Sequence, residues 1–79
     1  MEKGIIGKPK YKRKDMVQFV LEGIVYQGTV DIVDAYGTFE QNEEPSYDIL
    51  TPNFRDGETY LLKHIRESSV ISKMWSNCV

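Results

Sequence analysis

A single imidazole is available for acid–base chemistry in this sequence, that of His64, which precedes Ser68 and Ser69 by four and five residues. Nucleophilic catalysis needs a nucleophile, a base and an orienting group in one constellation. Because His64 lies in a predicted strand and the serines lie in the turn after it, nothing in the pattern brings the hydroxyls to the ring. We therefore expect no catalytic residue and no enzymatic activity.

Metal-ligating residues are also sparse. His64 and the single cysteine, Cys78, lie fourteen residues apart, whereas a zinc site takes three or four ligands at short spacings. The adjacent carboxylates Glu43 and Glu44 lack the regular alternation of a calcium-binding loop. The sequence therefore predicts no metal site and no cofactor.

Aromatic residues in predicted loops are the first candidates for binding. Tyr36 and Phe39 lie in the long polar connection 35–45, and Phe54 lies in the hairpin segment 52–58. Exposed loop aromatics often anchor interfaces, although aromatic side chains also fill the interior of small β domains. Neighbouring carboxylates would favour a basic protein partner. The predicted partner-binding residues are Tyr36, Phe39, Glu40, Glu43, Glu44 and Phe54.

The segment KPKYKRK, residues 8–14, is the second candidate, with five positive charges in seven residues. Such an arm could neutralise several phosphates and stack its tyrosine on a base. The residues of this alternative nucleic-acid site are Lys8, Lys10, Tyr11, Lys12, Arg13 and Lys14. The same segment could instead contact an acidic partner or the acidic loop, or serve as a solvated leader, and the sequence leaves these alternatives open.

Charge is distributed unevenly along the chain. Residues 1–14 hold six basic residues and one acidic residue, a net charge of +5, and residues 15–79 hold four basic and eleven acidic residues, a net charge of −7. An acidic body would repel the polyanion that the arm attracts. We expect a flexible basic leader at 1–14, one folded domain at 15–75 and a short extension at 76–79.

The composition and the termini limit the class of protein. The sequence contains no run of about 18 apolar residues, so we expect no membrane span. The N-terminus lacks the apolar core of a signal peptide. A lone cysteine cannot form a disulfide within the chain, which favours the cytoplasm. We expect a bacterial or phage origin for a small chain of this kind.

Five short runs of alternating or β-branched residues predict the strands that would position these side chains. The predicted strands are 16–22, 24–34, 46–51, 59–65 and 70–75. Gly28 predicts a bulge or a sharp bend in the second strand, and Pro52 is expected to end the third. Asp56-Gly57 predicts a hairpin turn, the polar segment 66–69 predicts one helical or 3₁₀ turn, and 37–41 could hold a further short strand.

An all-β order with a bent second strand, a tight hairpin between strands three and four, and one 3₁₀ turn before the fifth strand resembles the SH3-like small-barrel superfamily, including its Tudor-like and KOW-like branches. DMVQFVLEGIVYQGTV looks like the opening hairpin, and YLLKHIRESSVI looks like the fourth strand, the turn and the fifth strand. The aromatic ALYDY opening of signalling SH3 domains has no counterpart. The resemblance implies a barrel over 15–73 that binds rather than catalyses.

These observations predict a non-enzymatic binding module that contacts a protein partner through its aromatic and acidic loops. The alternative is a nucleic-acid accessory protein that uses the basic arm. Self-association through an exposed strand edge is a third possibility.

Overall fold

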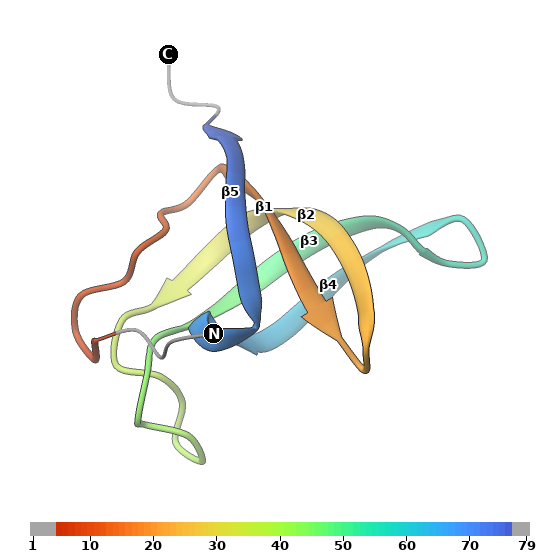
Figure 1. Ribbon diagram of the computed structural model, residues 1–79. Coiled ribbons are helices and arrows are strands. Elements are labelled where there is room, and N and C mark those ends of the chain that lie inside the picture. Colours follow the sequence, from red (N-terminus) through yellow and green to blue (C-terminus); the bar gives the residue numbers. More distant parts are fainter. Residues whose placement is uncertain (1–4, 77–79) are drawn as a thin grey trace.

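A computed structural model describes residues 5–76, except for the side chains of Asn53, Trp75 and Ser76 (Figure 1). Residues 1–4 of the predicted leader and 77–79 of the predicted extension lie outside the described residues. The elements are β1 (Asp15–Leu21), β2 (Ile24–Asp34), β3 (Ser46–Arg55), β4 (Glu58–Arg66), the 3₁₀ turn η1 (Glu67–Ser69) and β5 (Val70–Ser76). Between residues 5 and 76 no helix has the length and apolar character needed to cross a bilayer.

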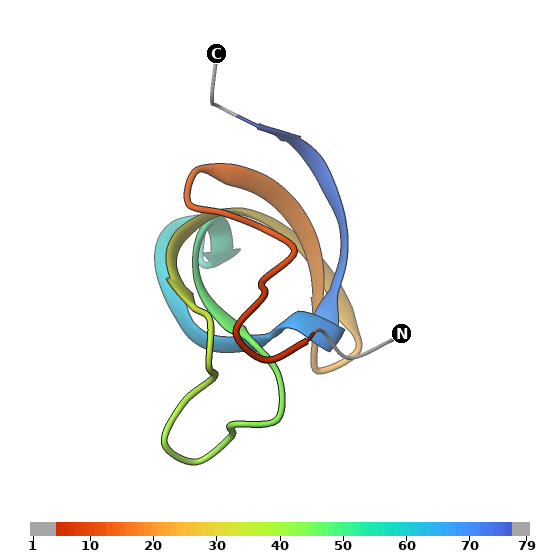
Figure 2. The same ribbon diagram turned by 90° about the vertical axis from the view of Figure 1, so that its left-hand side faces the viewer.

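The strands form one antiparallel sheet in the order β4-β3-β2-β1-β5, which confirms the all-β class. Figure 2 shows that the sheet coils around a central space. Strands twist in one direction, and this twist accumulates across a sheet until its inner face becomes enclosed. Over the described residues β4 and β5 remain the two edges, so backbone pairing does not close the sheet into a barrel.

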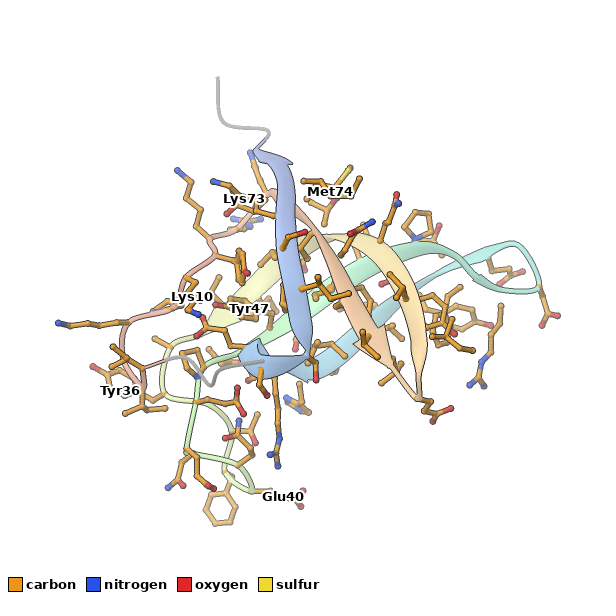
Figure 3. All side chains as sticks on the ribbon, viewed as in Figure 1. Lys10, Tyr36, Glu40, Tyr47, Lys73 and Met74 are labelled. Atoms are coloured by element: carbon orange, nitrogen blue, oxygen red, sulfur yellow. The ribbon has the colours of Figure 1, made fainter. Side chains whose placement is uncertain are left out.

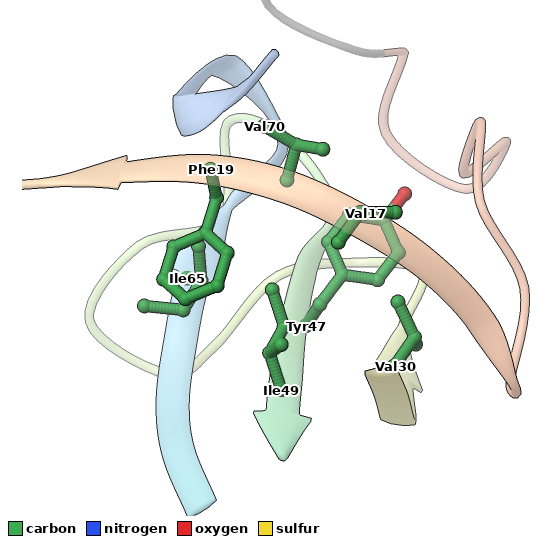
Figure 4. Close-up of a cluster of buried hydrophobic side chains, with 7 residues drawn as sticks. All are labelled: Val17, Phe19, Val30, Tyr47, Ile49, Ile65 and Val70. Atoms are coloured by element: carbon green, nitrogen blue, oxygen red, sulfur yellow. The ribbon is translucent and has the colours of Figure 1, made fainter. Parts of the chain in front are cut away.

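The core lies on the inner face of the coil (Figure 4). In β1, Val17 and Phe19 are fully buried, whereas Gln18 and Val20 between them are partly exposed, as the period-two pattern predicts. The buried hydrophobic residues are Val17, Phe19, Val30, Tyr47, Ile49, Ile65 and Val70. Every strand contributes to this cluster. Because Phe19 is fully buried in it, Phe19→Ala should lower the free energy of unfolding by about 3–5 kcal/mol.

Of the two alternatives predicted at Gly28, the bulge lies elsewhere and the sharp bend stays a prediction. Gly28 pairs regularly with Val17, and the register shift between β2 and β3 falls between Val30 and Ile32. Gly28 is required for a different reason: a Cβ there would lie 2.5 Å from Ile49 Cγ2. The glycine therefore permits the close approach of β3 rather than an irregular pairing.

The third strand is longer than predicted, because it continues through Pro52 to Arg55. The pairing of β2 with β3 stops at Thr29 and Leu50. Beyond that point one side of β3 has no partner strand among the described residues, so a residue without an N–H is tolerated there. The predicted Asp56-Gly57 turn joins β3 to β4, and this hairpin extends beyond the rest of the sheet (Figure 1).

Candidate functional site

The two ends of the predicted partner-binding set lie apart. Tyr36 and Phe39 lie in the loop 35–45 between β2 and β3, which contains no strand. Phe54 lies at the far end of β3, in the hairpin that projects away from that loop (Figure 1). The six predicted residues therefore do not form one surface.

Phe54 takes part in an aromatic row on the coiled sheet. Its ring lies 4.8 Å from that of Tyr26 and 5.6 Å from that of Tyr60, and Tyr26 in turn lies 5.9 Å from Phe19. The guanidinium of Arg55 covers the Phe54 ring at 5.0 Å. Phe54 is thus half-buried and held by packing, which gives it a structural role near the tip of the hairpin.

The loop 35–45 presents its aromatic side chains to solvent. Phe39 is fully exposed, and Tyr36 is 72% exposed. Figure 3 shows Tyr36 and Glu40 on the side of the molecule where this loop lies. Glu40 and Glu43 are exposed as well, so the loop surface combines an aromatic anchor with carboxylates.

Hydrogen bonds centred on Gln41 fix the shape of this loop. The Gln41 side chain accepts the N–H groups of Glu43 and Glu44 at 2.8 and 3.0 Å and donates to the Glu44 carbonyl at 3.1 Å. Its own N–H and carbonyl bond to Thr38. Gly37, at φ +75°, allows the tight entry, since a Cβ there would meet the carbonyl of Gln41 at 2.2 Å. The exposed Phe39 therefore lies on a loop whose conformation is held by the hydrogen bonds of Gln41.

Glu44 differs from the other predicted acidic residues, because it is fully buried. Its carboxylate accepts the N–H of Ser68 at 2.6 Å and the Ser68 hydroxyl at 3.0 Å. Glu44 thus connects the loop to η1 and does not contribute to the exposed surface of the loop.

The basic segment is bonded to the sheet through its main chain. Lys10 N–H donates to Glu67 Oε1 at 2.7 Å, Lys12 N–H donates to Asp15 Oδ2 at 3.0 Å, and Lys14 N–H donates to the Val30 carbonyl at 2.7 Å. The segment crosses one end of the coil (Figure 2). These bonds describe where residues 5–14 lie, while the flexibility of the segment stays a prediction.

The side chains of this segment divide into two kinds. The cationic ones, Lys8, Lys10, Lys12, Arg13 and Lys14, are all exposed, and none makes an ion pair with another described residue. Tyr11 instead packs edge-on against Tyr47, with ring centroids 5.7 Å apart. The Tyr11 ring is therefore partly buried against the core, while its stacking on a nucleic acid stays a prediction.

Glu67 and Tyr47 form a buried polar centre beneath this segment. The Tyr47 hydroxyl donates to Glu67 Oε1 at 2.5 Å and accepts the Tyr11 N–H at 3.3 Å. Burial, and then the hydrogen bond to Glu67, raise the pKa of Tyr47 well above its ordinary value. Burial and the charge of Glu67 also raise the pKa of Tyr11. The sequence pattern gave no sign of this centre, because Glu67 reads as a polar turn residue.

His64 lies beside the loop rather than beside the serines. It lines an open cavity of about 330 Å³ together with Thr38, Phe39 and Glu40. The backbone N–H of His64 donates to Asp48 Oδ1 at 3.1 Å. The metal-ligating side-chain atoms of Asp34, Asp48 and His64 all lie within 4.8 Å of one another. The Ser68 hydroxyl donates to Glu44.

No family model, no curated protein and no solved structure matches the chain.

Proposed function

We propose that this chain is a small non-enzymatic binding module that recognises a protein partner through the loop 35–45. The observation that carries the proposal is a fully exposed Phe39 on a loop braced by Gln41. Aromatic side chains are enriched in the contact surfaces of protein interfaces, where they fill pockets on the partner. Because the loop is already ordered by its own hydrogen bonds, less conformational entropy is lost when it binds.

An SH3-like architecture is part of this proposal. Strand order β4-β3-β2-β1-β5, with a 3₁₀ turn between β4 and β5, supports it. The coiled sheet with its enclosed core supports it as well. Such barrels serve as binding modules far more often than as catalysts, and a cytoplasmic location fits a chain with one cysteine.

The charge around Phe39 selects the kind of partner. Glu40 and Glu43 are exposed on the same loop, and Asp34 precedes it. Carboxylates at the rim of an apolar contact favour a basic partner and repel an acidic one. We infer that the partner presents an apolar pocket flanked by lysine or arginine.

A peptide selection tests this proposal. A phage-displayed random peptide library is selected on the full chain, and the enriched peptides are synthesised and measured by calorimetry. We expect basic peptides with an apolar residue, and we expect Phe39→Ala to weaken their binding on the order of 30-fold, as loss of a 2 kcal/mol anchor would.

Ile24→Ala is the matched control, because Ile24 is also a large exposed apolar residue but lies outside the loop. The proposal is wrong if the selected peptides bind the Phe39→Ala chain as well as they bind the wild type. Light scattering of the unliganded chain over a range of concentrations detects self-association through the edges of β4 or β5.

Nucleic-acid binding is the second candidate, and five exposed cations without an ion-pair partner in the described chain favour it. Because the main chain of this segment bonds to Glu67, Asp15 and Val30, its deletion would disturb the fold. The better variant replaces Lys8, Lys10, Lys12, Arg13 and Lys14 with glutamine. If the wild type binds labelled oligonucleotides with a clear negative salt slope and this variant does not, the arm is a nucleic-acid site.

A further inference from the structure

We propose that Asp34, Asp48 and His64 form a binding site for one divalent transition-metal ion of the Zn²⁺ type. Their ligating atoms, two carboxylate oxygens and an imidazole nitrogen, all lie within 4.8 Å of one another. The three residues come from three neighbouring strands, β2, β3 and β4. The proposal does not depend on the protein partner proposed above.

An irregularity in strand pairing brings His64 to this place. Tyr47 pairs with Ile65, whereas Ile49 pairs with Leu62. Two residues of β4, Lys63 and His64, therefore face the single residue Asp48 of β3, which is a β-bulge. The backbone of His64 takes a left-handed φ of +62°, and its N–H points to the Asp48 carboxylate.

The burial of the Asp48 carboxylate beside a second carboxylate is a further observation that points to a bound cation. Asp48 is 6% exposed. Among the described residues, its carboxylate accepts one hydrogen bond, from the backbone N–H of His64 to Oδ1. No lysine or arginine of the described chain pairs with this carboxylate, and its Oδ2, which accepts no hydrogen bond there, remains accessible to solvent and therefore to an ion. Another carboxylate, that of Asp34, lies close by. Burying such a group beside a like charge is costly, and a bound cation would remove that cost.

The donor set indicates the class of ion. Imidazole nitrogen with carboxylate oxygen suits Zn²⁺ and similar ions, whereas Mg²⁺ prefers oxygen ligands alone and keeps several waters. Zinc–ligand distances of about 2.0–2.2 Å place tetrahedral ligand atoms about 3.4 Å apart. The atoms would therefore move closer by up to about 1.4 Å from separations that lie within 4.8 Å, and Asp34 and His64 are exposed enough to rotate.

Three protein ligands leave a fourth tetrahedral position open. His64 borders the cavity that Thr38, Phe39 and Glu40 also line. A water molecule can complete the coordination there.

Calorimetry of the full chain with ZnCl₂ and with MgCl₂ tests the site. The chain carries Cys78→Ser throughout, so that its thiol cannot supply the metal ligand. We expect one Zn²⁺ per chain and a much weaker response to Mg²⁺. Asp34→Asn and His64→Gly should each weaken Zn²⁺ binding at least tenfold. Glycine is chosen at 64 because it adopts the observed positive φ without strain.

Asp31→Asn is the matched control, because it removes the same charge from the same strand but lies outside the cluster. Its affinity should stay within about twofold of the parent chain, since distant sites contribute independently. Circular dichroism checks that every variant is folded. Asp48→Asn, which keeps an oxygen to accept the backbone N–H of His64, should also weaken Zn²⁺ binding. Mn²⁺ should broaden the backbone NMR signals of the residues around 34, 48 and 64 before those of other segments.

Several outcomes would overturn the proposal. One is Zn²⁺ binding no tighter than about 1 mM. Another is equal binding by the parent chain and by folded Asp34→Asn. A third is equal binding of Mg²⁺ and Zn²⁺, which would indicate attraction to acidic charge rather than a site with a nitrogen ligand.

Discussion

Residues 5–14 and the loop 35–45 are both irregular, both charged and both predicted to bind, yet they are held in opposite ways. The basic segment is fastened to the body, because its N–H groups donate to Glu67, Asp15 and the Val30 carbonyl. The acidic loop is fastened mainly to itself, through the side chain of Gln41. The two segments also touch, since Gly7 N–H donates to the Ala35 carbonyl at 2.6 Å.

This difference decides which side chains remain available to a partner. In the basic segment the main chain is used for attachment, so the five cations stay exposed while Tyr11 is packed away. In the loop the internal bonds leave Phe39 outside. Buried carboxylates also hold the fold together, because Asp15, Glu44, Asp48 and Glu67 each accept a backbone N–H. Acidic residues in this chain are therefore as much structural as they are solvating.

The largest expected effect is on the basic segment. Glu67→Ala removes the acceptor for both the Lys10 N–H and the Tyr47 hydroxyl. Two donors left without a partner near the core should lower the free energy of unfolding by about 3 kcal/mol. Urea unfolding followed by circular dichroism measures this change.

Two controls define that result. Glu58→Ala removes a charge from an exposed position of β4 and should change stability by less than about 0.5 kcal/mol. Glu67→Gln keeps an oxygen acceptor, so it should cost less than half of what Glu67→Ala costs. Equal losses for Glu67→Gln and Glu67→Ala would show that the charge, and not the hydrogen bonding, is what stabilises the segment.

The next effect is a pH dependence that belongs to the same buried centre. The pKa of Tyr47 is raised above its ordinary value of 10 by burial and by its hydrogen bond to Glu67. The folded chain therefore holds the phenolic proton more tightly than the unfolded chain does. The stability from this group is complete below pH 10 and falls as the pH rises above it, by up to about 1.4 kcal/mol per pH unit.

Tyr47→Phe should cost about 1–2 kcal/mol at neutral pH through the lost hydrogen bonds, and it should flatten the alkaline fall in stability. Urea unfolding of both chains between pH 8 and about pH 11 gives the difference. Tyr11→Phe, which removes the other phenol whose pKa is raised by burial, should flatten the fall less. Parallel curves for the wild type and Tyr47→Phe would contradict the assignment.

The strands and the burial of loop residues differ in how well the sequence predicts them. Alternation of Val17 and Phe19 with polar neighbours predicts β1, and the Asp56-Gly57 turn predicts the β3–β4 hairpin. Both are local patterns. The burial of Glu44 depends on Ser68, which lies 24 residues further along the chain. Local composition cannot indicate such a contact, so Glu44 looks like one more solvated acid.

The same limit applies to Phe54 and to the metal-ligating group. Phe54 follows Pro52 and precedes a turn, which is typical of a loop, but its burial comes from Tyr26 on another strand. The meeting of Asp34, Asp48 and His64 depends on a bulge between β3 and β4. A shift of one residue in register turns a side chain to the other face. These positions therefore follow from the pairing and not from the spacing along the chain.

A smaller effect is expected in the loop. Gln41→Ala removes three side-chain hydrogen bonds to Glu43 and Glu44. Because they are confined to one loop, global stability should fall by only about 1 kcal/mol, while the amides of Glu43 and Glu44 exchange with solvent about tenfold faster. Hydrogen exchange by NMR measures the effect. Asn42→Ala, at an exposed neighbouring position, is the control, and equal exchange rates in the two variants would contradict the bracing role of Gln41.

The smallest effect on stability is expected from the five cations of the basic segment. Replacing Lys8, Lys10, Lys12, Arg13 and Lys14 with glutamine leaves every main-chain bond to the body in place. None of these side chains is ion-paired within the described chain, so stability should change by less than about 0.5 kcal/mol. A loss of more than about 1 kcal/mol that disappears in high salt would mean that long-range attraction to the acidic body holds the segment. In that case the basic segment would be held by the charge of its side chains and not by its main-chain hydrogen bonds, and the contrast with the loop would fail.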